Sequence, residues 1–395
     1  MRIEVTREEE LFREEVRDWL HDNVPKDERP TEDVDMGRAM RDFDLAWQKT
    51  QYEGGWAGLA WPKEFGGRGL AIDEMLIWHE EYARAHAPRI GTCFVGINHA
   101  GPTLIARGTA EQQTFHLPQI LRGDHIWCQG FSEPTAGSDL ANIKTRAEVD
   151  GDHLVVNGSK IWTSYGHLAK YGELLVRTDP DSRKHAGITW TIVDMESPGI
   201  EARPISTMTG PDDHHFCQVF YNDVRIPLSN VVGEINGGWS VANTTLGFER
   251  GTAFAAEQIH QAMLIENLID LARRPGPDGR PRIEDGEYAS RLAMIRAEMA
   301  AMRAMTYRSL NNAKRNNPGS DGSMIRLYFS EAQQRLKRLA MDILGPAGLE
   351  LSGDEGWTRL YLRSFSVTIA AGSCDIQRNI IGERVLGLPR GPRAQ

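Results

Sequence analysis

The chain has 395 residues, of which 40% are hydrophobic and 25% charged, and this suits a globular protein of two or three domains. A formal net charge of −10 argues against general nucleic-acid binding, which depends on basic patches. No run of about 18 apolar residues occurs, so we expect no membrane span. The four cysteines form no CxxC pair, which disfavours a disulfide framework or metal site and fits a cytoplasmic protein.

Helical patterns dominate the first part of the chain. Thr6 and Glu9 have the spacing of a capping box, and apolar residues then follow at helical intervals. A loop with Pro and three Gly over residues 61–69 precedes a second helical pattern over 72–82. We therefore predict an N-terminal α-helical domain over residues 1–126.

The hydrophobic period changes after that domain, where short segments rich in β-branched and aromatic residues begin. Asp150-Gly151 and Asn157-Gly158 have the composition of hairpin turns. The segments predicted as strands include 154–156, 161–163, 174–176, 188–193 and 219–221. We predict a middle antiparallel β domain over residues 127–236.

Helical periodicity then returns and persists over residues 237–395, which predicts a C-terminal helical bundle. Three apolar faces carry this prediction: Leu264, Leu268 and Leu271; Leu292, Ile295, Met299 and Met302; Leu336, Leu339 and Ile343. No strand–helix alternation and no GxGxxG after a strand are present, so a doubly wound dinucleotide fold is disfavoured. The predicted class is α+β.

Two segments of the β region carry the most specific pattern. Residues 131–139 (FSEPTAGSD) form a turn rich in hydroxyls and small residues, and residues 160–164 (KIWTS) place a Trp and a Ser on one strand face. Hydrogen bonds along one edge, together with an aromatic wall, are what a large flat heterocycle requires. The pattern resembles the flavin-binding signature of the acyl-CoA dehydrogenase family.

Further segments extend this resemblance over nearly the whole chain. They are GLAWPKEFGG at 58–67, NGSKIWTS at 157–164 and DIQRNIIGERVLGLP at 375–389. The resemblance implies that the fold holds FAD between the β domain and the C-terminal bundle. The residues matching cofactor contacts of the family are Gln129, Phe131, Ser132, Gly137, Ser138, Trp162, Ser164, Ser373 and Asp375, and Ser138 also matches a substrate contact. The alternative for Trp162 is an ordinary core aromatic.

The resemblance also identifies a candidate base. Removal of a weakly acidic α-proton requires a carboxylate whose pKa is raised by desolvation. Much of the family has a Glu where this chain has Ala371, and alanine cannot accept a proton. A subset carries the base on an earlier helix, in a segment matched by Leu246-Gly247-Phe248-Glu249-Arg250. Glu249 is therefore the candidate base and Arg250 a candidate substrate contact. Their alternatives are a solvated helix carboxylate and a surface salt bridge.

The segments that match the FAD diphosphate contacts of the family are altered. An expected Arg-x-x-Phe-Gly is replaced by residues 273–280 (RRPGPDGR), and an expected Gln-x-x-Gly-Gly by residues 342–346 (DILGP). Asp342 places a like charge near a diphosphate, and Pro346 lacks an N–H donor. Two assemblies stay open. One is a homotetramer with rewired contacts; the other is an α2β2 heterotetramer with a related chain, similar to those of actinobacterial steroid side-chain breakdown.

The leading functional prediction is an FAD-dependent acyl-CoA dehydrogenase of β-oxidation. It would convert a bulky, branched or steroid side-chain acyl-CoA to the trans-2-enoyl-CoA and pass electrons to an electron-transfer flavoprotein. The alternatives are a non-catalytic or half-site subunit that stabilises a related active chain, and a flavin oxidase or monooxygenase on the same fold. His214-His215, which follows two Asp, is interpreted as a polar turn rather than a metal site.

Overall fold

The structure is a computed structural model that describes residues 6–31, 34–210, 213–249, 253–276, 278–314, 321–351 and 356–391. Helices come first, strands follow, and helices complete the chain, which confirms the predicted α+β class. Contacts divide the chain into two compact units. The bundle unit comprises Met1–Val16, Leu76–Arg84 and Thr252–Gln395, and the sheet unit comprises Arg17–Met75 and Ala85–Gly251. Each unit is described by itself.

The helices begin and end close to the predicted signals. Before the sheet they are α1 (Arg7–Asn23), α2 (Arg38–Glu53), α3 (Ile72–Arg84), α4 (Gly101–Arg107) and α5 (Ala110–Arg122). After the sheet they are α6 (Gly238–Glu249), α7 (Ala253–Arg273), α8 (Gly286–Lys314), α9 (Asp321–Leu344), α10 (Trp357–Val367) and α11 (Cys374–Ile380). The predicted capping box is confirmed, because the Thr6 hydroxyl accepts from the Glu9 N–H at 3.1 Å and the Glu9 carboxylate accepts from the Thr6 N–H at 2.7 Å.

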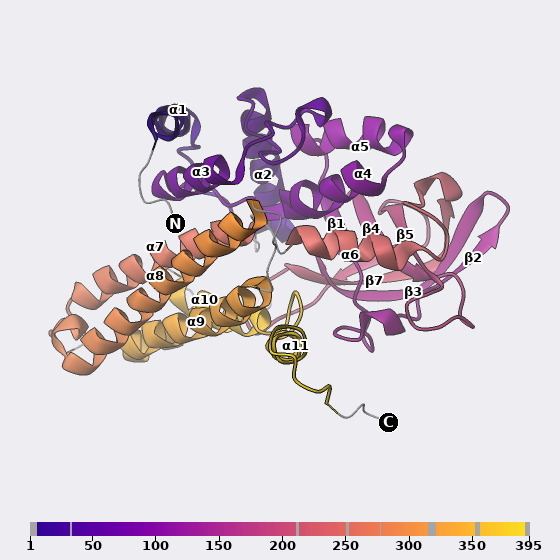
Figure 1. Ribbon diagram of the computed structural model, residues 1–395. Helices are drawn as coiled ribbons and strands as arrows, with labels where there is room; N and C mark the ends of the chain where they lie inside the picture. The colour runs from indigo at the N-terminus through magenta and orange to yellow at the C-terminus, as the bar shows by residue number, and fades with distance from the viewer. Residues whose placement is uncertain are drawn as a thin grey trace. The chain divides into compact units, whose positions relative to one another are not determined.

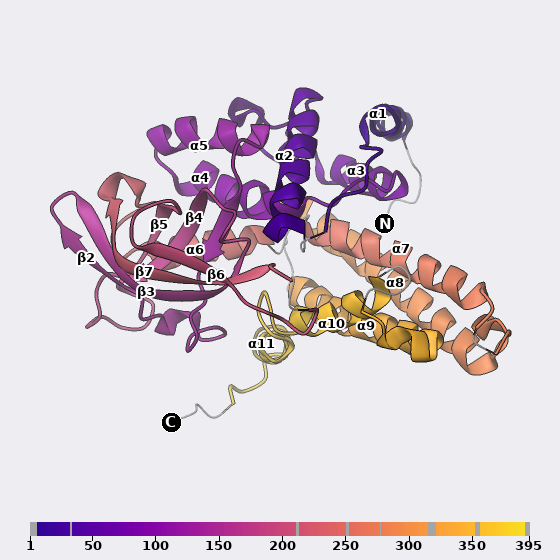
Figure 2. The same cartoon turned by 180° about the vertical axis from the view of Figure 1, so that it is seen from behind.

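The middle of the chain forms a sheet whose seven strands are mostly antiparallel (Figure 1). The strands are β1 (Trp127–Gly130), β2 (Arg146–Asp150), β3 (His153–Ser164), β4 (Tyr171–Arg177), β5 (Ile188–Asp194), β6 (Ile200–Pro204) and β7 (Phe216–Pro227). Their order is β1-β4-β2-β3-β7-β6, and β5 pairs with β4. The long strands β3 and β7 pair antiparallel, with β6 beside β7 (Figure 2). This pairing places residues 160–164 opposite the start of β7.

One predicted hairpin turn is confirmed and the other is wrong. Gly151 connects β2 to β3 at a φ of 62°, which suits glycine. Asn157-Gly158 instead lies inside β3, where the register with β7 shifts between Val156 and Gly158. The reason is steric, because a Cβ on Gly158 would lie 2.7 Å from the Thr145 Cα. Glycine here allows a close approach of two backbones rather than a turn.

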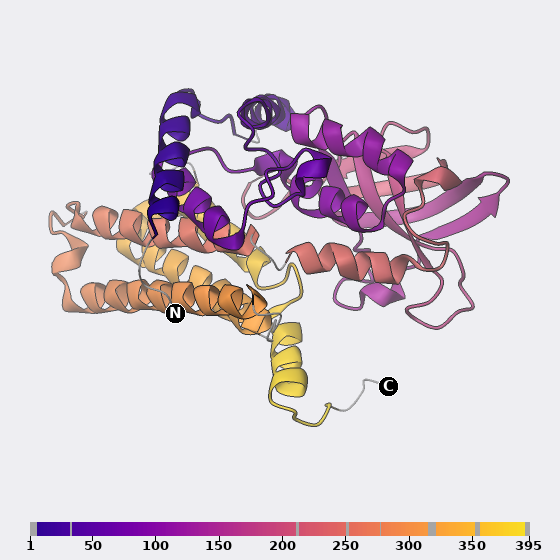
Figure 3. The same ribbon diagram turned by 45° about the horizontal axis from the view of Figure 1, so that its top comes forward.

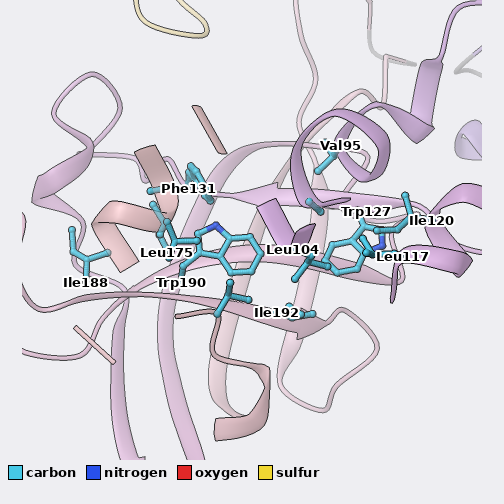
Figure 4. Packing of buried hydrophobic residues seen from close by; sticks show 14 of the residues in the cluster. Val95, Leu104, Leu117, Ile120, Trp127, Phe131, Leu175, Ile188, Trp190 and Ile192 are labelled. Carbon is cyan, nitrogen blue, oxygen red and sulfur yellow. The ribbon is translucent and has the colours of Figure 1, made fainter. Parts of the chain in front are cut away.

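Two hydrophobic cores cover the two faces of the sheet. Along β4, Leu174 and Val176 belong to one core and Leu175 to the other, as the two-residue period of a strand requires. Leu175 lies with Ile188, Trp190 and Ile192 of β5 in the core that α4, α5 and α6 complete (Figure 4). The helix side chains of this core include Leu104, Leu117, Ile120 and Val241. This packing makes the sheet a rigid platform for the loops at its edges.

The bundle unit has its own core between α7, α8, α9 and α10, and α7 lies beside α8 (Figure 3). The three predicted apolar faces all contribute to it, as the buried side chains of Leu268, Met302 and Leu336 illustrate. The helical bundle is therefore confirmed. Among the helices that the structure describes, none combines the length and apolarity needed to cross a membrane.

Candidate functional site

Four of the predicted residues lie on a short stretch of the sheet unit that we call the ring wall: Phe131, Ser132, Trp162 and Ser164. The first two follow the end of β1, and the other two end β3. The Ser132 carbonyl accepts from the Ile161 N–H at 2.9 Å, which joins the two segments. The turn after Ser132 is closed by reciprocal bonds of 3.0 Å between Glu133 and Ala136. The two segments of the signature, far apart in sequence, thus lie side by side.

A buried ion pair supports the ring wall from behind. Lys160 has no exposed surface, and its Nζ donates to Glu133 Oε1 at 2.8 Å and to the Phe131 carbonyl at 3.1 Å. Glu133 also accepts from the N–H groups of Lys144 and Thr145 at 2.7 and 2.8 Å. Every bond of this pair fixes the turn that carries Ser132, so the pair determines where the turn lies relative to β3.

The two charges shift each other's titration. Burial lowers the pKa of Lys160 to about 8, although the Glu133 carboxylate opposes this shift. Burial alone would raise the pKa of Glu133, but Lys160 and the two main-chain donors outweigh burial and hold that pKa below its usual value. Both groups are therefore charged near neutral pH, which keeps the hydrogen bonds intact.

Trp162 does not lie in the core. Its side chain is 55% exposed, and the Phe216 ring meets it edge-on at a centroid distance of 5.7 Å and an angle of 88°. Its φ of 62° is unusual for a bulky residue, and the β3–β7 register shifts between Lys160 and Thr163. The bulge turns an aromatic face outward, where a flat ligand can stack on it.

Ser164 ends β3, and its hydroxyl lies 3.2 Å from His215 Nε2. His215 directly precedes β7, so the antiparallel pairing brings it to Ser164 across 51 residues of sequence. The sequence prediction assigned this histidine to a polar turn and gave it no role. Only strand register relates the two residues, and the composition of the segment gives no signal of that register.

The remaining predicted residues of the sheet unit differ in whether their polar groups are already bonded within the chain. The Gln129 side-chain amide nitrogen donates to Glu173 Oε1 at 2.7 Å, so this donor is already engaged. Gly137 and Ser138 are exposed, and a Cβ on Gly137 would meet nothing within 4 Å. The hydroxyls of Ser132 and Ser138 bond to no other residue in the described ranges.

The predicted residues near the C-terminus belong to the bundle unit. Ser373 caps α11, where its hydroxyl accepts from the Ile376 N–H at 3.3 Å. Asp375 is an exposed carboxylate that pairs with Arg378 at 3.3 Å. Ala371, at the family position of the usual base, has a φ of 52°. Glu249 is the last residue of α6, but its side chain lies outside the described part of the structure, and so does all of Arg250.

Charged residues of the segments that match diphosphate contacts, which we call the phosphate region (residues 273–280 and 342–346), pair within the chain. Asp342 pairs with Arg291 of α8 at 2.5 Å. Arg273 pairs with Asp270 at 2.6 Å, and Arg282 pairs with Asp278 at 2.9 Å. These charges already have partners on their own subunit.

A cavity of about 240 Å³ lies between the end of α3, α7 and α8. Most of its lining is apolar, including Ile259, Met263 and Met299, and Gln258 and Arg303 add polar groups. The lining includes none of the predicted site residues whose side chains the structure describes.

The ring wall fits the isoalloxazine ring of FAD on chemical grounds. It offers one exposed aromatic face and two serine hydroxyls, of which Ser132 is not engaged with another described residue. The buried Thr163 hydroxyl beside it also has no partner in the described part of the chain. A flat heterocycle with hydrogen-bonding edges is the ligand that uses both features.

Comparison with known proteins covers the same three regions. Residues 6–124, 128–224 and 236–386 match the models of the N-terminal, middle and C-terminal domains of acyl-CoA dehydrogenases. Acyl-CoA dehydrogenase IpdE1 of Mycobacterium tuberculosis (strain ATCC 25618 / H37Rv) is 41% identical over 386 residues, which cover 96% of this chain and 98% of the relative. IpdE1 of Mycolicibacterium smegmatis (strain ATCC 700084 / mc(2)155) is 42% identical over 394 residues, with 96% and 97% covered.

Among solved structures, the Tcur3481-Tcur3483 steroid ACAD is similar at a TM-score of 0.85 and 33% identity, covering 99% of this chain and 100% of that chain. The ChsE4-ChsE5 complex from Mycobacterium tuberculosis is similar at a TM-score of 0.82 and 33% identity, with the same coverage. Both are complexes of two differently named chains.

Proposed function

The chain belongs to the acyl-CoA dehydrogenase family of oxidoreductases, and on this premise we propose that it desaturates the Cα–Cβ bond of a bulky acyl-CoA with FAD as cofactor. The observation that carries the proposal is the ring wall, where the exposed face of Trp162 and the hydroxyls of Ser132 and Ser164 lie on two joined segments of one sheet.

Bound FAD would supply the acceptor for the β-hydride. The ring wall would hold its flavin ring, with Trp162 stacked on one face and Ser132 and Ser164 bonded along the edge. Gly137 and Ser138 would extend this edge, because both are exposed and the missing Cβ of Gly137 leaves the main chain accessible. Gln129 would contribute its main chain or its side-chain oxygen, because its amide nitrogen is bonded to Glu173.

Glu249 is the proposed base that removes the α-proton. It ends α6, and Phe248 beside it contributes apolar surface that would desolvate a carboxylate once substrate covers the site. Desolvation raises a carboxylate pKa toward neutrality, which is what abstraction of a weakly acidic proton needs. Arg250 would contact the thioester side of the substrate, as its position in the family motif implies.

The proposed substrate is a steroid side-chain thioester or a similarly bulky acyl-CoA, and the proposed product is the trans-2-enoyl-CoA. Support comes from the 33% identity to a solved steroid ACAD over nearly the whole chain. The resemblance adds that a base on this earlier helix is the arrangement of family members acting on branched or long chains. An electron-transfer flavoprotein would take the electrons onward. The proposed setting is cytoplasmic β-oxidation, and the four unbridged cysteines suit that compartment.

The proposed assembly is an α2β2 heterotetramer with a related chain. Arg273, Asp278 and Asp342 of the phosphate region pair within this chain, as Asp342 does with Arg291, so these three charges are poorly disposed to hold a diphosphate. Two similar solved structures are two-chain complexes. A homotetramer with rewired contacts is the competing assembly.

A second candidate function is a half-site or non-catalytic subunit that stabilises a related active chain. Ala371 favours it, because the position of the usual base holds a residue that cannot take a proton. Retention of the ring wall and of Glu249 counts against it, since a pure scaffold needs neither.

The test is to purify the protein with its native partner and assay a panel of acyl-CoAs from short linear to steroid side-chain thioesters. The proposal expects bound FAD and enoyl-CoA formation with an artificial electron acceptor, highest for the bulky thioesters. Turnover only on short linear substrates would contradict the substrate class. Absence of turnover on every substrate would favour the subunit role, and oxygen consumption without an acceptor would indicate an oxidase.

A further inference from the structure

His215, which directly precedes β7, and Phe216, which begins it, contact two side chains of the ring wall. The His215 ring lies 3.2 Å from the Ser164 hydroxyl through Nε2, and the Phe216 ring meets Trp162 edge-on at 5.7 Å. Trp162 is the exposed aromatic of the wall, and Ser164 is its hydroxyl at the end of β3. The start of β7 therefore forms a second layer behind the residues that would touch a flavin.

His215 is held in place by several bonds. Its carbonyl accepts from the Tyr165 N–H at 2.7 Å, and its N–H donates to Asp213 Oδ1 at 3.2 Å. Asp213 is buried and also accepts from the Thr207 hydroxyl at 2.7 Å. The imidazole lies against the rings of Tyr165 and Phe216, at centroid distances of 4.5 and 4.4 Å. Bonds to both main-chain groups and ring contacts thus fix the direction in which Nε2 points.

Trp162 of the ring wall and Tyr165, which directly follows β3, have unusual backbone conformations. Trp162 and Tyr165 have φ values of 62° and 54°, and they flank Ser164 within four residues. Bulky residues rarely occupy this region, and such conformations persist when surrounding contacts over-determine them. The contacts from His215 and Phe216 are of that kind.

We infer that His215 is a positioning residue whose Nε2–H donates to Ser164 Oγ, which leaves the Ser164 O–H directed toward the bound cofactor. A serine hydroxyl rotates freely unless a partner selects one direction, and Nε2 is the partner in the described part of the chain. The inference rests on the proposed function, because the oriented hydroxyl has a role only when FAD is bound. The neighbouring His214 has no such contact; its ring lies 6.3 Å from that of His167.

Three variants separate the hydrogen bond from packing. His215→Phe keeps an aromatic ring against Tyr165 and Phe216 but removes the bond to Ser164. His215→Gln supplies an amide near the position of Nε2 and should restore the bond. His214→Gln is the matched control at the adjacent position. Each variant is prepared with whatever partner chain the wild type carries, and FAD affinity, the visible spectrum of the bound flavin and the melting temperature are recorded.

We expect His215→Phe to weaken FAD binding by about fivefold to tenfold, within the range of one hydrogen bond, and to shift the flavin absorption bands with little change in melting temperature. His215→Gln and His214→Gln should stay within about twofold of wild type, as replacements that keep or never touch the bond. In a Ser164→Ala background, His215→Phe should have no further effect, because the residue acts through Ser164.

The outcomes distinguish failure of the proposed function from failure of the inference about His215 alone. Wild-type protein that lacks flavin even together with its partner chain would overturn the proposed function, and the inference with it. Wild type with bound flavin, but with His215→Phe indistinguishable from it or fully additive with Ser164→Ala, would overturn the inference alone. An equal loss of FAD affinity in His214→Gln would also overturn it, since the effect would then belong to the loop and not to the bond.

Discussion

The ring wall and the phosphate region both match cofactor contacts of the family, but their ion pairs differ in burial. The ion pair that supports the ring wall from behind is buried, with side-chain exposures of 0% for Lys160 and 5% for Glu133. The pairs of the phosphate region are exposed, as Arg291 and Asp342 show at 37% and 41%. Breaking a buried pair leaves a stranded charge, whereas an exposed pair contributes little. The ion pair behind the ring wall is therefore needed for folding, whereas the pairs of the phosphate region lie on the surface and contribute little to stability.

The two regions also differ in which side-chain groups a ligand could contact. The ring wall leaves an aromatic face and hydroxyl groups available, while Arg273, Asp278 and Asp342 of the phosphate region pair within the chain. We infer that this chain holds the flavin ring itself and depends on a related chain for the diphosphate.

The largest expected effect is on chemistry rather than on either binding region. Glu249→Gln should lower turnover by roughly 10²–10⁴-fold, because an amide cannot accept the α-proton. FAD content should stay unchanged, since neither the ring wall nor the phosphate region is altered. Stopped-flow reduction of the flavin by the preferred acyl-CoA measures this directly. Activity within a few-fold of wild type would exclude Glu249 as the base.

Removal of the buried ion pair should have the largest effect on stability. Lys160→Met strands the Glu133 carboxylate and should lower the free energy of unfolding by about 3–5 kcal/mol, with loss of FAD because the turn carrying Ser132 is released. Denaturant unfolding measures this. Lys184→Met, which breaks the exposed pair with Asp139, should cost no more than about 1 kcal/mol. Equal effects of the two variants would refute the role of the buried pair.

The same ion pair gives the ring wall a dependence on acidity. Since the Glu133 pKa is held below its usual value, this carboxylate contributes stability above about pH 4.5, and the contribution is lost as the pH falls. Glu133→Gln should therefore show less loss of stability than wild type between about pH 5 and pH 3. Thermal melting over this range tests the expectation. Parallel curves for the two proteins would contradict it.

A smaller effect is expected at Trp162. Trp162→Ala should weaken FAD binding by about tenfold to a hundredfold, as loss of one aromatic stack implies. Its melting temperature should change little because the side chain is more than half exposed. Phe115→Ala removes an aromatic of equal exposure, 55%, from α5 and is the matched control. If the two variants bound FAD equally well, the stacking role would be wrong.

The smallest effect is expected in the phosphate region. Asp342→Gln restores the residue type of the family and removes a like charge from the expected diphosphate contact. If a related chain supplies that contact, FAD affinity should stay within about twofold and stability within about 1 kcal/mol, as for other exposed pairs. Fluorescence titration with FAD measures the affinity. A gain of tenfold or more would indicate that this chain binds the diphosphate itself.

Much of the fold was predictable from the sequence because periodicity reports it directly. The faces containing Leu268 and Leu336 are buried as their spacing indicates, and the Thr6–Glu9 capping box forms. Asn157-Gly158 was mispredicted because its composition is that of a turn. What distinguishes it is the approach of Thr145, which directly precedes β2, and this approach is a tertiary property.

The candidate site was predictable in residue types but not in the contacts that hold them. The motif identified Trp162 and Ser164, yet the bulge that exposes Trp162 depends on its register with β7. Lys160 and Glu133 lie 27 residues apart, and only the pairing of β3 with the preceding turn joins them. His215 had no sequence signal, because a histidine in a polar segment is ordinary until strand pairing places it at Ser164.

The most direct test of the central claim is the amount of FAD bound per chain. The protein is purified alone and after co-expression with the related acyl-CoA dehydrogenase chain of its native host, and flavin absorbance is compared with protein concentration at matched subunit concentration. The account predicts far less than one FAD per site for the chain alone and full occupancy in the two-chain complex. Full occupancy in a homotetramer of this chain alone would contradict it.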